Sequence, residues 1–198
     1  MRIGIFGGTF NPIHNGHINL VNKICDEIFL DKLFVFPTKT PPHKIAKNLV
    51  TEKDRFEMCK LAFEGNYLAE VSDYEINNQG KSYTIFTLRY LKEQFENAEL
   101  FLFMGSDMYV TLHEWKCFEE ILSLATIVVV SRSIDDKIKI KDYKPFLIEK
   151  GAKTIIIDIE PFEISSTKIR EMIMQNEDCS CYLPQKVVEY IRYFNLYK

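Results

Sequence analysis

Short apolar runs alternate with segments of helical periodicity along most of the chain. Several runs are apolar at every position, as strands are when both of their faces are buried. The strand-like runs are Ile3–Phe6, Leu33–Phe36, Leu68–Ser72, Leu100–Met104, Ile127–Val130 and Ile155–Ile157. Because helices and strands alternate in this way, the pattern predicts an α/β fold with a doubly wound, mainly parallel sheet.

The helical segments are recognised by apolar residues three or four positions apart. They are expected around Ile18–Ile28, Phe56–Phe63, Ile85–Phe95, Ile169–Ile173 and Pro184–Leu196. The second begins with the capping-box pattern Thr51-Glu52-Lys53-Asp54 and is expected to bury Phe56, Cys59 and Phe63. The charged stretch from Ser131 to Asp142 is expected to be a surface loop.

A glycine turn with two histidines separates the first predicted strand from the first helix. It reads Gly7-Gly8-Thr9-Phe10-Asn11-Pro12-Ile13-His14-Asn15-Gly16-His17. Glycine lets the backbone approach a ligand, and a helix start offers N–H groups and a positive dipole end to an anion. The turn therefore predicts a phosphate site that both His14 and His17 can face.

The P-loop is excluded because no Lys stands at the start of the helix. The dinucleotide-binding loop is excluded because the glycines do not spell Gly-x-Gly-x-x-Gly. The alternative for two nearby histidines is a metal pair. A zinc site needs a third ligand, and no Cys or carboxylate is local to this turn. Phosphate contact is the favoured interpretation.

More polar motifs follow the later strands, and ligands of such sheets bind beyond the carboxyl ends of the strands. The prolines of Pro37–Lys44 hold an extended loop, either a rigid linker or a support that brings His43 and Lys44 to a phosphate. Ser82-Tyr83-Thr84 stands where a helix begins. Ser82 or Thr84 is expected to cap that helix, to seat an anion with the same hydroxyl and N–H groups, or to do both.

The fourth strand ends in Gly105-Ser106-Asp107, and Trp115, the single Trp, follows shortly. A lone Trp is usually core, but it can also stack on an aromatic ligand. The last motif is Ile164-Ser165-Ser166-Thr167-Lys168-Ile169-Arg170. Capping explains one serine, whereas three hydroxyls followed by the forked guanidinium of Arg170 indicate a polyphosphate site.

These motifs resemble, in order, those of the bacterial nicotinate-nucleotide adenylyltransferases. The first resembles the Gly-Thr-Phe-Asp-Pro-x-His-x-Gly-His signature of their nucleotidyltransferase superfamily and departs from it at Asn11, where Asp is usual. Pro41-Pro42-His43-Lys44, Ser-Tyr-Thr, Gly-x-Asp, the Trp, the Ser-rich helix start and the closing helix resemble the same family. The resemblance implies a Rossmann-like nucleotidyltransferase fold, with one domain over residues 1–198 that closes in a helical segment over about 165–198.

The resemblance also implies transfer of the adenylyl group of ATP to nicotinate mononucleotide, with release of pyrophosphate. It assigns catalysis to His14, His17, Lys44 and Arg170. It assigns ATP binding to Gly7, Gly8, Thr9, Phe10, Gly16, Gly105, Asp107, Ile164, Ser165, Ser166 and Thr167. It assigns nicotinate mononucleotide binding to His43, Lys44, Ser82, Tyr83, Thr84 and Trp115. Mg²⁺ is expected to arrive with ATP, without a metal site in the protein.

Two other functions share part of this pattern. Pantetheine-phosphate adenylyltransferase resembles the first motif and the Ser-rich helix start, but it is usually shorter, and nothing in that family resembles Pro-Pro-His-Lys or Lys-Ser-Tyr-Thr. A protein that senses ATP without turnover is the alternative outside enzymes. The complete set of His14, His17, Lys44 and Arg170 argues against it, since binding alone needs no coverage of both sides of the α-phosphate.

Composition bears on three further properties: nucleic-acid binding, membrane insertion and the redox environment. The net charge of −3 over 198 residues argues against a nucleic-acid surface, and no apolar run has the length of a membrane span. Five Cys at irregular spacing fit a reducing, cytoplasmic environment. Cys179 and Cys181 are either two thiols in a loop or a redox or metal pair, and the former is favoured. The oligomeric state is left open, a homo-oligomer included.

Overall fold

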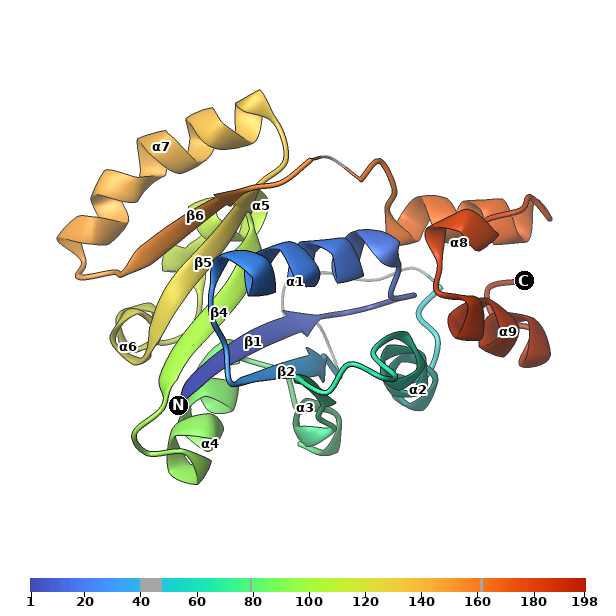
Figure 1. Ribbon diagram of the computed structural model, residues 1–198, viewed down its shortest axis with the longest axis horizontal. Coiled ribbons are helices and arrows are strands. Elements are labelled where there is room, and N and C mark those ends of the chain that lie inside the picture. The colour runs from blue at the N-terminus through green and yellow to red at the C-terminus, as the bar shows by residue number, and fades with distance from the viewer. Residues whose placement is uncertain (40–47, 79, 161) are drawn as a thin grey trace. The chain divides into compact units, whose positions relative to one another are not determined.

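A parallel sheet forms the centre of the computed structural model, which describes residues 1–39, 48–78, 80–160 and 162–198. Within these residues the sheet has six strands in the order β3-β2-β1-β4-β5-β6 (Figure 1). The strands are β1 (Arg2–Gly8), β2 (Lys32–Pro37), β3 (Ala69–Val71), β4 (Glu99–Gly105), β5 (Ala125–Ser131) and β6 (Thr154–Asp158). Each lies on a run that the apolar pattern predicts, which confirms the doubly wound α/β fold.

The strand order reverses between β1 and β4, which pair in parallel with Ile5 opposite Leu102. At such a switch point the connections leave the carboxyl ends of two neighbouring strands on opposite faces, which is where ligands of these folds bind. β4 continues in parallel to β5, and β5 to β6. Leu100–Met104 and Ile127–Val130 are at most 5% exposed, as expected for strands covered on both faces.

Helices follow the strands, and every helix that the sequence pattern predicts is present. The α-helices are α1 (Asn15–Glu27), α2 (Glu52–Ala62), α3 (Tyr74–Asn77), α4 (Thr84–Gln94), α5 (Ser106–Val110), α6 (Phe118–Leu124), α7 (Ile134–Glu149), α8 (Ser166–Met174) and α9 (Gln185–Tyr193), and the short 3₁₀ helices are η1 (Leu112–Glu114) and η2 (Ser180–Tyr182). Thr51 accepts a hydrogen bond from Asp54 N, so the predicted cap of α2 is confirmed.

The expectation of a surface loop over Ser131–Asp142 is wrong, because most of that stretch belongs to α7. Ser133 caps the helix by accepting a hydrogen bond from Asp136 N at 3.1 Å. Ile140 and Leu147, seven positions apart, are buried and hold it in place. The charges between them hide this spacing, and the apolar residues Ile134 and Ile138 face solvent.

The buried face of α2 also differs from its prediction. Cys59 and Phe63 are buried as expected, but Phe56 is only half-buried, and Arg55 and Met58 take the inner positions. The helix is therefore rotated toward a charged residue, which an apolar pattern cannot select.

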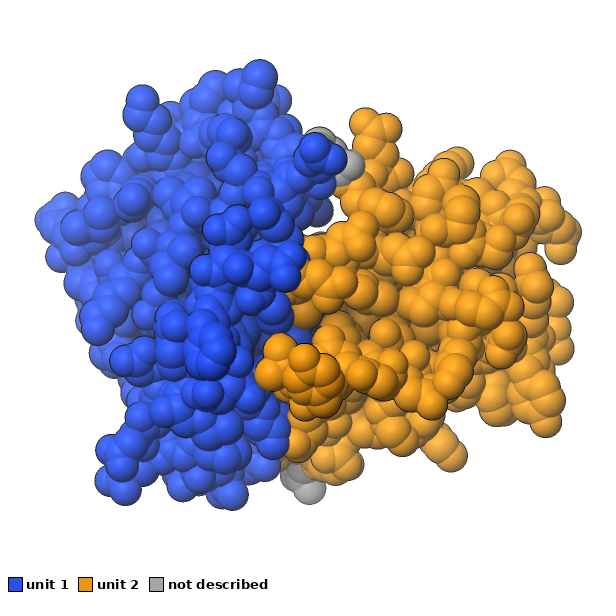
Figure 2. Space-filling view, viewed as in Figure 1, with its two compact units in different colours: residues 1–7, 23–34, 83–161 blue, residues 8–22, 35–82, 162–198 orange. Residues whose placement is uncertain are grey.

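The chain forms two compact units, each assembled from separate segments (Figure 2). The first contains residues 1–7, 23–34 and 83–161, and in it α6 and α7 contact β5 while α4 contacts α6. The second contains residues 8–22, 35–82 and 162–198, and in it α2 contacts both α9 and β3. The single domain over residues 1–198 stays a prediction.

None of the helices in the described residues combines the length and the apolar character that crossing a membrane requires.

Candidate active site

The two histidines of the first motif lie together at the start of α1. Their rings stack with centroids 3.8 Å apart and planes 30° apart. The His14 side chain is buried, His17 is half-buried, and the Phe10 ring meets His17 edge-on at 5.2 Å. The spacing of three residues therefore brings both imidazoles to one place, as expected for neighbours on a helical turn.

One backbone hydrogen bond sets the chemistry of His17. Its Nδ1 accepts the backbone N–H of His14 at 3.2 Å. A nitrogen that accepts cannot carry the ring proton, so the neutral imidazole holds its proton on Nε2. His17 thereby offers an N–H donor at Nε2.

Gly16 is needed because of the His14 ring. A Cβ at residue 16 would lie 3.0 Å from His14 Nδ1 and 3.1 Å from its Cε1, and 3.3 Å from the Phe162 ring. A side chain here would displace the imidazole, so the Gly between the two histidines keeps the stack in place.

The Ser-rich helix start uses each of its three hydroxyls differently. Ser165 caps α8 by accepting Lys168 N at 3.2 Å. Ser166 Oγ donates to Pro12 O at 2.9 Å, and Thr167 Oγ1 accepts from Arg170 Nη2 at 3.2 Å. Capping therefore accounts for one hydroxyl, and another fastens the helix to the histidine loop.

Asn11 joins these parts, although the sequence pattern gave it no role in the site. Its carbonyl oxygen accepts from Arg170 Nη1 at 2.8 Å, and its side-chain Oδ1 accepts from Tyr197 Oη at 2.9 Å. Arg170 is thus held on the loop that carries His14. The one indication of a role for Asn11 in the sequence is that Asp is usual at this position of the resembling signature. Nothing in the sequence indicates a role for Tyr197.

Arg55 is a second residue that sequence reasoning missed. Its side chain is 0% exposed, and it donates to Thr9 O at 2.8 Å and to Lys39 O at 3.2 Å. Burial lowers the pKa of the guanidinium, and the charge of Glu52 partly offsets that effect. Arginine remains charged even so, which places a buried cation beneath the first motif and the start of the Pro-rich loop.

The Pro-rich loop itself lies largely outside the described residues, and so do His43 and Lys44. At its start, Lys39 N donates to Ser82 Oγ at 3.0 Å and Lys39 Nζ donates to Asn78 O at 3.0 Å. The hydroxyl of Ser82 is thus engaged by Lys39, and the N-cap of α4 is Tyr83, without a side-chain cap. The capping interpretation of Ser82 and Thr84 is wrong, and the anion-seat interpretation stays a prediction.

Gly105, Asp107 and Trp115 belong to the first unit. Gly105 is the N-cap of α5, and a Cβ there would meet Arg132 Nη2 at 3.0 Å, while Asp107 is exposed in the first turn. Trp115 is half-buried at the end of η1. Next to it, Lys116 Nζ lies 4.7 Å from the ring centre of Tyr83 and 4.8 Å from that of Phe86.

Ile164 N donates to Phe162 O at 2.7 Å, and the backbone there leads directly into α8. Across the part of the chain that the structure describes, His, Cys, Asp and Glu side chains form no group of three or more that could hold a metal ion.

Comparison with known proteins gives the family. A model described as cytidylyltransferase-like matches residues 5–172. A Clostridium tetani protein named "Probable nicotinate-nucleotide adenylyltransferase" is 38% identical over 196 residues, which are 98% of each chain. A Clostridium perfringens protein of the same name is 39% identical over all of this chain and 98% of its own. The chain belongs to the nicotinate-nucleotide adenylyltransferase family.

Solved structures agree with this family in fold. The Plasmodium falciparum nicotinic acid mononucleotide adenylyltransferase complexed with NaAD has a TM-score of 0.78 at 21% identity and covers 99% of this chain and 97% of its own. The same Plasmodium protein complexed with APC has a TM-score of 0.77 at 20% identity. Nicotinate-nucleotide adenylyltransferases therefore share the fold over essentially the whole chain.

Of the two units, the second gathers the predicted residues His14, His17, Gly16, Ser165–Thr167 and Arg170. The first unit holds Gly105, Asp107, Tyr83, Thr84 and Trp115. The individual roles of all these residues stay predictions, because family membership identifies the reaction and not the contacts.

Proposed function

We propose that this chain transfers the adenylyl group of ATP to nicotinate mononucleotide and so forms nicotinate adenine dinucleotide and pyrophosphate. The observation that carries the proposal is the stacked His14–His17 pair on a loop whose Asn11 carbonyl holds Arg170. Two N–H-bearing rings and a guanidinium that binds the same loop provide the donors that a polyphosphate requires.

The reaction is an in-line displacement at the α-phosphorus of ATP. An ionised oxygen of the mononucleotide phosphate forms a new bond to that phosphorus, and the bond to the bridging oxygen of the β-phosphate breaks. The electron pair leaves with pyrophosphate, so no proton transfer and no covalent enzyme intermediate are needed. Catalysis of this kind consists mainly of positioning and of neutralising charge.

The residues take the following roles in this proposal. His17 donates from Nε2 to the α-phosphate, His14 packs against it and joins in holding the leaving oxygens, and Arg170 neutralises the polyphosphate. Lys44 adds charge from the Pro-rich loop. Mg²⁺ carried in with ATP would add to the neutralisation of the phosphate charge, and no residue of the chain is assigned to hold it.

The test is pyrophosphate release from ATP with three acceptor conditions. Release is expected with nicotinate mononucleotide, and not with phosphopantetheine or with ATP alone. Release with phosphopantetheine instead would point to the pantetheine enzyme. ATP binding without release under any condition would point to a sensor. The cytoplasmic location stays a prediction, to be checked by fractionation, and sedimentation would determine the oligomeric state.

A further inference from the structure

We propose that Tyr197 is a positioning residue for Arg170 and that it acts through Asn11. The inference rests on the proposed function, since Arg170 matters through its contact with the polyphosphate. The three residues are distant in sequence, but they belong to the same compact unit.

The Asn11 side chain has a partner for each of its polar atoms. It is 3% exposed. Its Oδ1 accepts from Tyr197 Oη at 2.9 Å and from Val50 N at 3.3 Å, and its Nδ2 donates to Asn48 O at 3.1 Å. Two donors face the oxygen and one carbonyl faces the nitrogen, so a single orientation of the amide satisfies all three contacts.

The main chain of the same residue holds the guanidinium. Asn11 O accepts from Arg170 Nη1 at 2.8 Å, and Thr167 Oγ1 accepts from Nη2. Because side chain and carbonyl belong to one residue, the contacts that anchor the Asn11 side chain also hold in place the carbonyl that orients Arg170. The Tyr197 hydroxyl therefore reaches the guanidinium in two steps.

Tyr197 itself is held in an uncommon conformation. Its φ is +65°, in the left-handed region that a bulky residue rarely adopts, and its side chain is 8% exposed. Such strain persists where surrounding contacts fix it, and it gathers at functional positions. Burial raises the pKa of the hydroxyl, and the nearby guanidinium groups of Arg170 and Arg55 only partly oppose it, so the group remains a donor.

This arrangement explains why Asn stands at position 11. An Asp would keep the acceptor for Tyr197 and Val50, but it would place a carboxylate oxygen about where Nδ2 now meets Asn48 O. A buried oxygen facing another oxygen lacks its hydrogen bond, which destabilises this contact. Changing Asn11 to the Asp that is usual in the resembling motif should therefore harm this chain.

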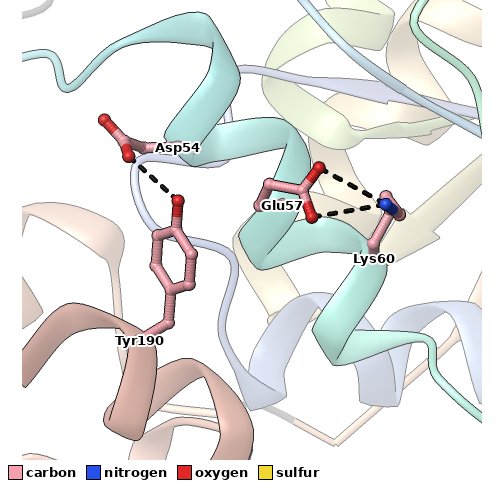
Figure 3. A network of polar contacts seen from close by, with 4 residues as sticks. All are labelled: Asp54, Glu57, Lys60 and Tyr190. Atoms are coloured by element: carbon pink, nitrogen blue, oxygen red, sulfur yellow. Dashed lines mark hydrogen bonds and ion pairs between the residues drawn. The ribbon is translucent and has the colours of Figure 1, made fainter. Parts of the chain in front are cut away.

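The experiment compares two tyrosines that each lose only a hydroxyl. Tyr197→Phe is expected to lower kcat/KM for ATP about tenfold, as the loss of one such contact at about 1.4 kcal/mol predicts. Tyr190→Phe is the matched control: Tyr190, on α9, donates to the carboxylate oxygen Asp54 Oδ1 at 3.0 Å (Figure 3), whereas Tyr197 donates to the Asn11 amide. Tyr190→Phe is expected to lower the unfolding midpoint about as much as Tyr197→Phe does. It is expected to leave kcat/KM for ATP within about twofold of the wild-type value.

A double-mutant cycle separates positioning from general stability. In an Arg170→Ala background, Tyr197→Phe should cost less than about twofold, because the group that it positions is gone. Asn11→Asp should likewise lower kcat/KM in the wild-type background and cost less than about twofold in the Arg170→Ala background. An equal loss in both backgrounds, or a fully active Tyr197→Phe, overturns the proposal.

ATP affinity, measured by titration calorimetry on the same variants, repeats the cycle without turnover. It should fall with Tyr197→Phe in the wild-type background and stay unchanged in the Arg170→Ala background. A wild type that binds ATP but releases no pyrophosphate would refute the proposed function alone, and the calorimetric cycle would still decide the role of Tyr197.

Discussion

His17 illustrates at the residue scale how one backbone contact selects a chemical form. The His14 N–H bonded to Nδ1 leaves the donor on Nε2. A donor that is in place before the reaction needs no reorganisation when charge builds up on the α-phosphate oxygens. Such donors stabilise the transition state more than the bound substrate.

We therefore predict that His17→Ala lowers kcat by about 10²–10³ and weakens ATP binding far less. His113→Ala is the control, because His113 is exposed on η1 and contacts Tyr143. Steady-state kinetics with varied ATP provide the measurement. A raised KM with unchanged kcat would show that His17 contributes only ground-state binding.

Arg55 and Asn11 show at the same scale what the sequence could not provide. The motif predicted where His14, His17 and Arg170 gather, because glycine turns and helix starts have local rules. Arg55 is buried by partners from two other segments, Thr9 and Lys39. A charged residue on a helix is usually taken as surface, and only the tertiary fold supplies the carbonyls that accept hydrogen bonds from its Nη1 and Nη2.

At the scale of elements, the strands were predictable because both of their faces are buried. Their runs are apolar throughout, so neither register nor neighbours had to be known. α7 was missed because charges surround its two buried residues, Ile140 and Leu147. A helix with so few buried residues shows only weak apolar periodicity in its sequence. Its N-cap residue, Ser133, is a stronger indication of the helix than that periodicity.

Two helix caps should differ in function although they share one geometry. Ser165→Ala and Ser133→Ala each remove a side-chain cap and should each cost about 1 kcal/mol of unfolding free energy. Ser165→Ala should in addition lower kcat/KM for ATP, since α8 carries Arg170 and is fastened to Pro12 through Ser166. Denaturant unfolding and steady-state kinetics on both variants provide the measurements. Equal kinetics for the two would show that α8 is only structural.

At the scale of the whole molecule, an acidic chain must bind two anionic substrates. A net charge of −3 cannot attract them by itself, so positive potential has to be local. The second unit supplies Arg55 and Arg170. In the first unit we expect positive potential at the start of α4, where Tyr83 is a cap without a side-chain hydrogen bond, and at the ammonium group of Lys116 over Tyr83 and Phe86.

Nicotinate mononucleotide should accordingly be preferred over its amide by about 10⁴ in kcat/KM, because donors arranged for a carboxylate leave the amide N–H₂ unpaired. Lys116 is exposed, and a surface charge of this kind is worth at most about 1 kcal/mol, so Lys116→Met should reduce the preference by no more than roughly fivefold. The N–H groups at the start of α4 must then supply most of the discrimination.

Trp115→Ala should weaken the binding of both mononucleotides alike, since a stacked ring cannot tell acid from amide. Measuring kcat/KM for both substrates in the three proteins tests each part, and equal use of acid and amide by the wild type would show that α4 begins without an anion seat.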